Sequence, residues 1–353
     1  MRLVFERRVQ QRQELEEILK TRTFPSSDGE KVKVSEDRDI GFMVYGAKED
    51  IKGVIVYIHG TPGSRFFITK AQEEAARVRG LQVILFERPG FGLSTFQKDR
   101  TLLSFAEDIK IALEKLNLIP KKDEKEEQKQ DGQEEVVNEK RFPKIAILGY
   151  SAGGGYACAC AYAFGKLLSN LTLVCSPSPP EAPDVTAGMT LFNKFAYWLS
   201  QNWEWALKKA VRMEANEISK NPIKKIFESL VGSSNGDDSC FLMNGEIETA
   251  FVLSAKEQYS NPDGAEAEAQ DYWLFSHSWG FALDKIEIGQ LEDNSKPTTV
   301  VWSGLQDKSV VPSMGKYLGS SIKNSALKEL EEKGHLFIFE CWEEILDQII
   351  QNF

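Results

Sequence analysis

A short apolar run that ends in a glycine-flanked serine most constrains the fold of this chain. Residues 144–156 read Lys-Ile-Ala-Ile-Leu-Gly-Tyr-Ser-Ala-Gly-Gly-Gly-Tyr, and the apolar stretch stops at Ser151. Gly149, Ser151 and Gly153 fit G-x-S-x-G, the pattern of a sharp strand-to-helix turn that exposes a serine side chain. Glycine suits both flanking positions because a Cβ there would collide with a neighbouring strand or helix. Because so short a motif also arises by chance, the surrounding sequence decides its meaning.

Strand and helix patterns alternate along much of the chain. Continuous apolar runs, typical of strands covered on both faces, predict strands at 54–58, 81–86, 145–148, 171–175 and 298–302, with a shorter one at 327–331. Helical periodicity is found at 69–79, 103–116, 313–320 and 341–350. Two antiparallel strands at 31–34 and 40–45 are expected to open the sheet. This order predicts an α/β fold, a mostly parallel sheet with right-handed crossovers and flanking helices.

Changes in composition divide the chain into segments. Residues 1–24 are expected to contain a charged N-terminal helix, and residues 25–177 and 291–353 to form the α/β core. Within the core, 14 of the 21 residues from 121 to 141 are charged, which predicts a solvated, disordered insertion. Residues 178–290 are mostly helical in pattern and rich in Phe, Trp and Leu. We expect them to form a helical lid inserted into the core.

Charge and cysteine content exclude some classes of protein. A formal charge of −10 argues against a nucleic-acid-binding surface, which needs a clustered basic face. The five cysteines lack the spacing of metal ligands and fit buried small side chains in a reducing compartment. Residues 145–165 are uncharged over the length of a membrane span, but the strand character of the first five favours a buried strand and helix. The N-terminus becomes charged before a signal-peptide core can form, so we expect a cytoplasmic protein.

A serine hydroxyl needs a base within hydrogen-bond reach before it can act as a nucleophile at neutral pH. The chain has three histidines. His335 follows a glycine in the loop between the last strand and the last helix, which returns to the sheet edge that carries Ser151. His59 ends a buried strand, where a structural hydrogen bond is expected, and His277 belongs to the predicted lid. We therefore assign the base to His335.

The base in turn needs a carboxylate that holds it in the right tautomer. Asp307 stands in a loop just after the strand at 298–302 and 28 residues before His335. The chain order Ser151, Asp307, His335 is that of α/β-hydrolase triads. Three further aspartates have less suitable places and remain fallback candidates: Asp271, Asp284 and Asp293.

A tetrahedral oxyanion needs two backbone N–H donors. Ala152, directly after the serine, is expected to supply one. The second is expected from the loop after the strand at 54–58. Pro62 has no N–H, so Thr61 is the best candidate in that loop.

Five short motifs together resemble the α/β-hydrolase superfamily, in its single-domain type with a helical cap. They are His59-Gly60-Thr61-Pro62-Gly63, Arg88-Pro89-Gly90-Phe91-Gly92-Leu93-Ser94, Gly149-Tyr150-Ser151-Ala152-Gly153, Gly304 with Asp307, and Gly334-His335. The resemblance implies hydrolysis of an ester, thioester or amide through an acyl-enzyme on Ser151, with no metal or organic cofactor. Glu87 stands where many relatives have aspartate, and we expect it to be structural.

Three functions remain open. The first is a carboxylesterase or lipase-like enzyme acting on a small, apolar acyl substrate. The serine at position 151 excludes epoxide hydrolases and haloalkane dehalogenases, because those enzymes attack through an aspartate. The second resembles prolyl iminopeptidases and needs an acidic lid residue for the substrate amine, with Glu204, Glu214 and Glu217 as candidates. The third is a non-catalytic receptor or scaffold. The sequence predicts no stable membrane span and leaves the oligomeric state undecided.

Overall fold

A single mixed β-sheet organises the part of the chain that the structure describes. The computed structural model describes residues 2–121, 142–233, 244–289 and 296–353. The strands are β1 (Glu30–Lys33), β2 (Asp39–Gly46), β3 (Gly53–Ile58), β4 (Leu81–Phe86), β5 (Ile145–Tyr150), β6 (Asn170–Val174), β7 (Thr299–Gly304) and β8 (Ser325–Leu330). Their order in the sheet is β1-β2-β4-β3-β5-β6-β7-β8. All pairs from β4 to β8 are parallel, whereas β1–β2 and β2–β4 are antiparallel. The predicted fold class is confirmed.

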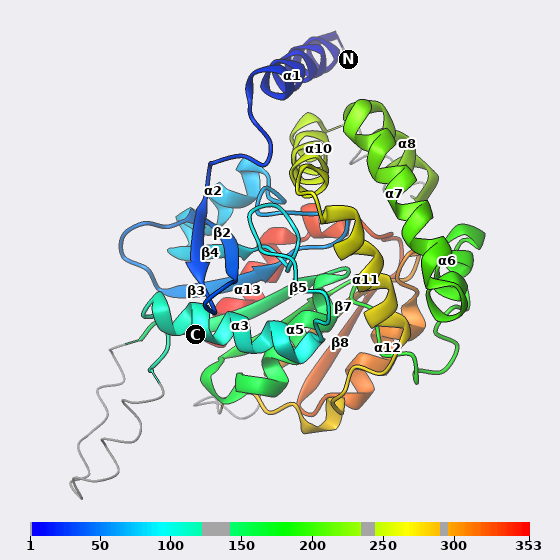
Figure 1. Cartoon of the computed structure of the whole chain (residues 1–353). Coiled ribbons are helices and arrows are strands. Elements are labelled where there is room, and N and C mark those ends of the chain that lie inside the picture. Colours follow the sequence, from blue (N-terminus) through cyan, green and yellow to red (C-terminus); the bar gives the residue numbers. More distant parts are fainter. Residues whose placement is uncertain (1, 122–141, 234–243, 290–295) are drawn as a thin grey trace, which may run out of the picture.

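Helices cover both faces of this sheet because its central strands are apolar on both sides (Figure 1). In β3, Val54, Val56 and Ile58 pack on one face, while Ile55 and Tyr57 pack on the other. The first face is covered by α3 (Leu102–Lys115), α5 (Gly153–Phe164) and α12 (Pro312–Ser321), and the second by α2 (Lys70–Val78) and α13 (Trp342–Ile350). Alternating side chains of one strand thus serve two hydrophobic cores.

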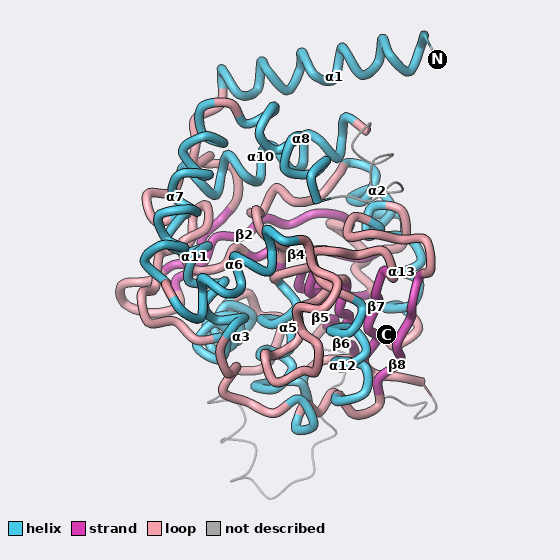
Figure 2. The backbone as a smooth tube through the Cα atoms, turned by 90° about the vertical axis from the view of Figure 1, so that its right-hand side faces the viewer, coloured by secondary structure: helices cyan, strands magenta, loops and turns pink. Residues whose placement is uncertain are grey.

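Several helices stand between β6 and β7, and we call them the inserted helices. They are α6 (Leu191–Asn202), α7 (Glu204–Lys220), α8 (Pro222–Ser233), α10 (Gly245–Ser260) and α11 (Gly264–Ser276). Figures 1 and 2 show them gathered at one side of the sheet. A small apolar cluster joins α6, α7 and α11 through Ala196, Leu199, Leu207, Val211 and Ala269. Helix α10 instead packs into the core on the α2 and α13 side.

The N-terminal helix α1 (Arg2–Thr21) lies against the inserted helix α10 (Figure 1). Its Leu15 side chain is buried, and Arg12 forms an ion pair of 3.0 Å with Glu248. The predicted charged helix is therefore present.

The uncharged run 145–165 forms β5, a turn and the whole of α5, as the sequence predicts. Within the described ranges, no helix combines the length and the apolar character that crossing a membrane requires. The charged insertion, apart from Lys121, and the fallback candidate Asp293 lie outside the described residues.

Candidate active site

Ser151 occupies a strained turn between β5 and α5. Its φ of +50° lies in the left-handed region that residues with a Cβ rarely adopt. The turn is tight enough that a Cβ at position 153 would lie 2.1 Å from the carbonyl oxygen of Ile58. A Cβ at position 60 would lie 2.9 Å from that of Ser151. The glycines therefore let two backbone segments approach the serine closely.

Ser151, His335 and Asp307 are in hydrogen-bond contact. His335 Nε2 lies 2.9 Å from Ser151 Oγ, and His335 Nδ1 lies 2.7 Å from Asp307 Oδ2. The Asp307 side chain is 1% exposed and that of His335 is 17% exposed. A buried carboxylate that accepts from Nδ1–H leaves Nε2 free to take the serine proton. The structure brings the three residues together as the sequence predicts.

The backbone fixes the carboxylate of Asp307. Its other oxygen, Oδ1, accepts hydrogen bonds from the N–H groups of Ser309 at 2.8 Å and Val310 at 2.9 Å. At the end of β7, a Cβ on Gly304 would lie 2.4 Å from the carbonyl oxygen of Lys333. The absence of a side chain at Gly304 thus allows the loop before His335 to close over the end of β7.

The remaining histidines and aspartates of the sequence analysis have other partners. His59 is buried, with Nδ1 2.8 Å from the Gly60 carbonyl oxygen, and burial with the nearby Arg88 charge holds its pKa well below the ordinary value. His277 stacks on Trp273. Asp284 forms an exposed ion pair with Lys285.

Asp271, the other fallback aspartate, belongs to a buried polar cluster. It pairs with Arg88 and Arg100 and accepts a hydrogen bond from the Tyr156 hydroxyl. Arg88, itself fully buried, also donates to the Gly60 carbonyl at 2.9 Å and to Thr61 Oγ1 at 2.6 Å. Asp271 therefore orients the arginine that holds the loop carrying Thr61.

Glu87 belongs to a second buried network of ion pairs and hydrogen bonds, which agrees with a structural role. It accepts hydrogen bonds from Arg65 Nη1 and from the Leu93 N–H, both at 2.7 Å. Arg65 also binds Glu257 of α10 at 2.7 Å. Burial raises the pKa of Glu87 to about 7, although the Arg65 charge opposes that shift. The network joins the core to α10.

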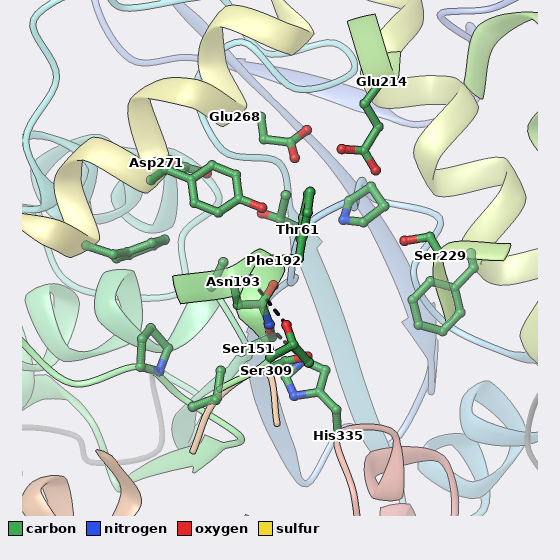
Figure 3. A pocket seen from close by; sticks show the side chains of 18 of the residues that line it. Thr61, Ser151, Phe192, Asn193, Glu214, Ser229, Glu268, Asp271, Ser309 and His335 are labelled. Carbon is green, nitrogen blue, oxygen red and sulfur yellow. Dashed lines mark hydrogen bonds between the residues drawn. The ribbon is translucent and has the colours of Figure 1, made fainter. Parts of the chain in front are cut away.

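A cavity of about 780 Å³ opens at Ser151 (Figure 3). Thr61, Ala152 and His335 line it beside the serine. Its apolar lining includes Phe67, Met189, Phe192, Ile218, Phe251 and Phe275, and its acidic lining comprises Glu214, Glu217, Glu228, Glu268 and Asp271. The cavity thus has an apolar part and an acidic part, both formed largely by the inserted helices.

Glu214 and Glu268 face each other on the side of the cavity away from Ser151 (Figure 3). Glu268 accepts hydrogen bonds from Gln258 Nε2 and the Tyr259 hydroxyl. Burial, and then the charge of Glu214, raise the pKa of Glu268 to about 8. Glu214 remains accessible from the cavity, yet the protein around it displaces enough water to raise its pKa as well.

Sequence reasoning missed Glu268. It lies among other charged residues of α11, and a helical carboxylate in such a sequence resembles a solvent-facing residue. Its contacts to Gln258 and Tyr259 come from a second helix, which no local pattern indicates.

Three potential metal ligands also meet at this site. The ligand atoms of Cys175, Asp307 and His335 lie within 4.8 Å of one another, the only such group among the described residues. Asp307 and His335 already share a hydrogen bond. Two of the three donors, Asp307 and His335, are therefore already engaged with each other and, through His335, with Ser151.

A family model described as the α/β hydrolase fold matches residues 130–340, more than half of the chain. The chain belongs to the α/β-hydrolase fold family. This membership supports hydrolase activity, and the predicted superfamily is confirmed. No curated protein sequence matches the chain.

Solved structures of other family members resemble this hydrolase over nearly its whole length. An esterase from Exiguobacterium antarcticum is 16% identical, with a TM-score of 0.56 over 92% of this chain and 99% of its own. A thermophilic esterase from Thermogutta terrifontis is 20% identical, with a TM-score of 0.58 over 91% and 97%. A bromoperoxidase from Bacillus anthracis is 17% identical, with a TM-score of 0.57 over 92% and 100%. At these identities the likeness is one of fold.

Proposed function

We propose that this α/β hydrolase cleaves esters of small acyl substrates through an acyl-enzyme on Ser151. The observation that carries the proposal is the contact of Ser151 Oγ with His335 Nε2 at 2.9 Å and of His335 Nδ1 with Asp307 at 2.7 Å. An isolated serine is a weak nucleophile, whereas a serine joined to an oriented imidazole can lose its proton as it attacks.

The reaction proceeds in two halves. Ser151 Oγ attacks the ester carbonyl carbon while His335 Nε2 takes its proton, and Asp307 stabilises the resulting imidazolium. Collapse of the tetrahedral intermediate breaks the bond to the alkoxy oxygen, which leaves as the alcohol with the proton from His335. Water, deprotonated by His335, then attacks the acyl carbon and releases the carboxylic acid and free Ser151.

Thr61 and Ala152 are the proposed oxyanion donors. Both line the cavity beside Ser151, and neither of their N–H groups has an acceptor among the described residues. Such donors stabilise the negative charge that develops on the carbonyl oxygen. We propose that residues 178–290, which contain the inserted helices and their flanking loops, act as a lid. The inserted helices supply the apolar wall that would receive the acyl group.

A fluorophosphonate probe tests this function directly. The wild-type protein should be labelled at Ser151 and should hydrolyse p-nitrophenyl esters, with a preference among acyl lengths set by the cavity. Ser178 also lines the cavity, so Ser178→Ala is the matched control and should still be labelled. An unlabelled wild-type protein would favour the non-catalytic receptor or scaffold instead.

The acidic part of the cavity favours a second candidate, an aminopeptidase resembling prolyl iminopeptidases. Of the three glutamates considered for binding a substrate amine, Glu204 pairs with Lys208 at 2.8 Å and Glu217 with Lys220 at 3.1 Å. Glu214 lines the cavity opposite Glu268. Hydrolysis of a proline arylamide in preference to p-nitrophenyl esters, lost in Glu214→Gln, would select this candidate. Retained ester hydrolysis in Glu214→Gln would select the first.

A further inference from the structure

Large apolar side chains gather on the outer face of two inserted helices. Of the fourteen exposed large apolar residues among those described, seven fall between positions 191 and 213, and we call these seven the aromatic patch: Leu191, Phe192, Phe195, Trp198, Trp203, Trp205 and Met213. Trp205 is 69% exposed and Trp203 is 53% exposed. Single exposed apolar residues are ordinary, but a contiguous group marks an interaction site.

Three aromatic rings of the patch, from Phe195, Trp198 and Trp203, are in contact with one another. Leu191, Phe195 and Trp198 recur at the spacing of one helical face on α6. The rings of Phe195 and Trp198 stack with centroids 6.0 Å apart, and Trp198 meets Trp203 edge-on at 5.2 Å. Helix α6 lies at the edge of the molecule, away from the sheet (Figure 1). These rings therefore pack on one another without being covered by the core.

The patch is continuous with the mouth of the cavity. Phe192 and Met213 are 66% and 61% exposed, and both also line the cavity that contains Ser151. Figure 3 shows Phe192 in this position. A surface that covers the patch would therefore also face the entrance to the candidate active site.

Cations outnumber carboxylates along the segment that carries the patch, since residues 191–213 hold four Lys or Arg and one acidic residue, Glu204. The chain has a formal charge of −10, yet Lys194, Lys208, Lys209 and Arg212 accompany the patch. Lys208 and Arg212 pair with Glu266, and Lys208 also with Glu204. The exposed Lys194 and Lys209 have no ion pair within the described ranges. An apolar surface edged by cations complements an anionic surface.

We propose that the aromatic patch docks this protein on a phospholipid surface that carries anionic headgroups. Trp and Phe side chains partition into the interface between headgroups and acyl chains, and adjacent Lys and Arg attract anionic lipids. A second copy of the chain is a poorer partner, since a twofold contact would bring the same cations of both copies together. The docking does not depend on the chemistry at Ser151.

Vesicle co-sedimentation of the full chain tests the proposal. The wild-type protein should pellet with vesicles of phosphatidylcholine and phosphatidylglycerol more than with phosphatidylcholine alone, and high salt should reduce the difference. Its tryptophan emission should shift to shorter wavelength and be quenched by brominated acyl chains. Ser151→Ala should bind equally, which separates docking from catalysis. Wild-type protein that stays in the supernatant with both lipids would overturn the proposal.

Two sets of variants identify the surface. Trp198→Ser/Trp203→Ser/Trp205→Ser should bind vesicles at least about tenfold more weakly, because affinity scales with the apolar area inserted. Lys194→Glu/Lys209→Glu should lose the preference for phosphatidylglycerol. The matched control, Ile51→Ser/Val78→Ser, changes exposed apolar residues elsewhere and should bind as wild type.

Hydrolysis of a soluble short-chain ester without lipid should be unchanged in the triple tryptophan variant, because none of the three residues lines the cavity. Unchanged activity and melting temperature would show that the variant is folded. Equal vesicle binding by the triple variant and the wild type would overturn the proposal. So would dimers in sedimentation velocity that the triple variant abolishes, since the patch would then be a contact between copies.

Discussion

Arg88 Nη2 lies 2.6 Å from Thr61 Oγ1. The same nitrogen donates to the Gly60 carbonyl oxygen at 2.9 Å, and His59 Nδ1 lies 2.8 Å from that oxygen. That carbonyl and the N–H of Thr61 belong to one peptide group, so donors on the oxygen polarise the N–H. In the proposed mechanism Arg88 therefore strengthens an oxyanion donor as well as holding its loop.

Arg88→Gln should lower kcat by about tenfold with little change in KM, which is less than the cost of removing an oxyanion donor outright. Affinity for a trifluoromethyl ketone, which forms an oxyanion on the enzyme, should fall in parallel. Arg88→Lys should recover part of both. Should Arg88→Gln raise KM alone, Arg88 would act on substrate binding and not on the oxyanion.

Ser151→Ala should reduce kcat by about 10⁴-fold or more, because the nucleophile is lost. His335→Ala should cost nearly as much, and the double variant should lose little beyond either single variant, since the two residues act as a unit. Steady-state assays on a p-nitrophenyl ester measure this, with Ser178→Ala as control. Full activity in His335→Ala would show that another group is the base.

Asp307→Asn should lower kcat by roughly 10⁴-fold while leaving the fold intact. The asparagine oxygen can still accept from Ser309 and Val310, but its NH₂ would then face His335 Nδ1. That contact favours the tautomer with the proton on Nε2, which cannot take a proton from Ser151. Single-turnover assays with circular dichroism separate this effect from unfolding. Near-normal acylation would disprove the assigned part of Asp307.

The free energy of unfolding should fall as pH rises from about 5 to 8, in part through Glu268. Its pKa in the folded state is raised to about 8, so the folded state binds more protons than the unfolded state in this range. The stabilisation is complete below the unfolded pKa and is lost as pH rises through the folded pKa. Its full size is on the order of a few kcal/mol.

Glu268→Gln resembles the protonated form and can keep the hydrogen bonds from Gln258 and Tyr259. Urea unfolding at pH 5 to 8.5 should therefore show a flatter pH dependence in this variant than in the wild type. Glu228→Gln is the control, since Glu228 is exposed and pairs with Lys224 and Lys225. Identical slopes for Glu268→Gln and wild type would show that Glu268 is ionised throughout.

The parts of the site that follow strands could be predicted because sheet geometry brings them together. Ser151 follows β5, Asp307 follows β7 and His335 follows β8, and parallel strands end at one edge. Strand and helix bounds were predicted within two residues for the same reason, since continuous apolar runs and glycine stops are local signals. The sequence also predicted a structural hydrogen bond for His59.

The wall formed by the inserted helices could not be predicted in the same way. Whether Glu214 faces the cavity or solvent depends on how α7 packs against α11. The spacing of apolar residues in the sequence does not indicate how two helices pack. The presence of Glu268 and Asp271 in the cavity wall could therefore not be predicted. The exposure of Trp203 and Trp205 could not be predicted either, because an aromatic residue in a helical segment more often packs inside the protein.

Buried ion pairs hold some of the inserted helices to the core more firmly than others. Glu257 of α10 is tied to Arg65, and Asp271 of α11 is tied to Arg88 and Arg100. Moving either helix away from the core would leave buried charges without a partner and without water to solvate them. Within the described residues, α6, α7 and α8 carry no fully buried ion pair to the core. We therefore expect α6, α7 and α8 to move more readily than α10 and α11 when a molecule enters the cavity. The exposed tryptophans of the aromatic patch belong to this more mobile group of helices.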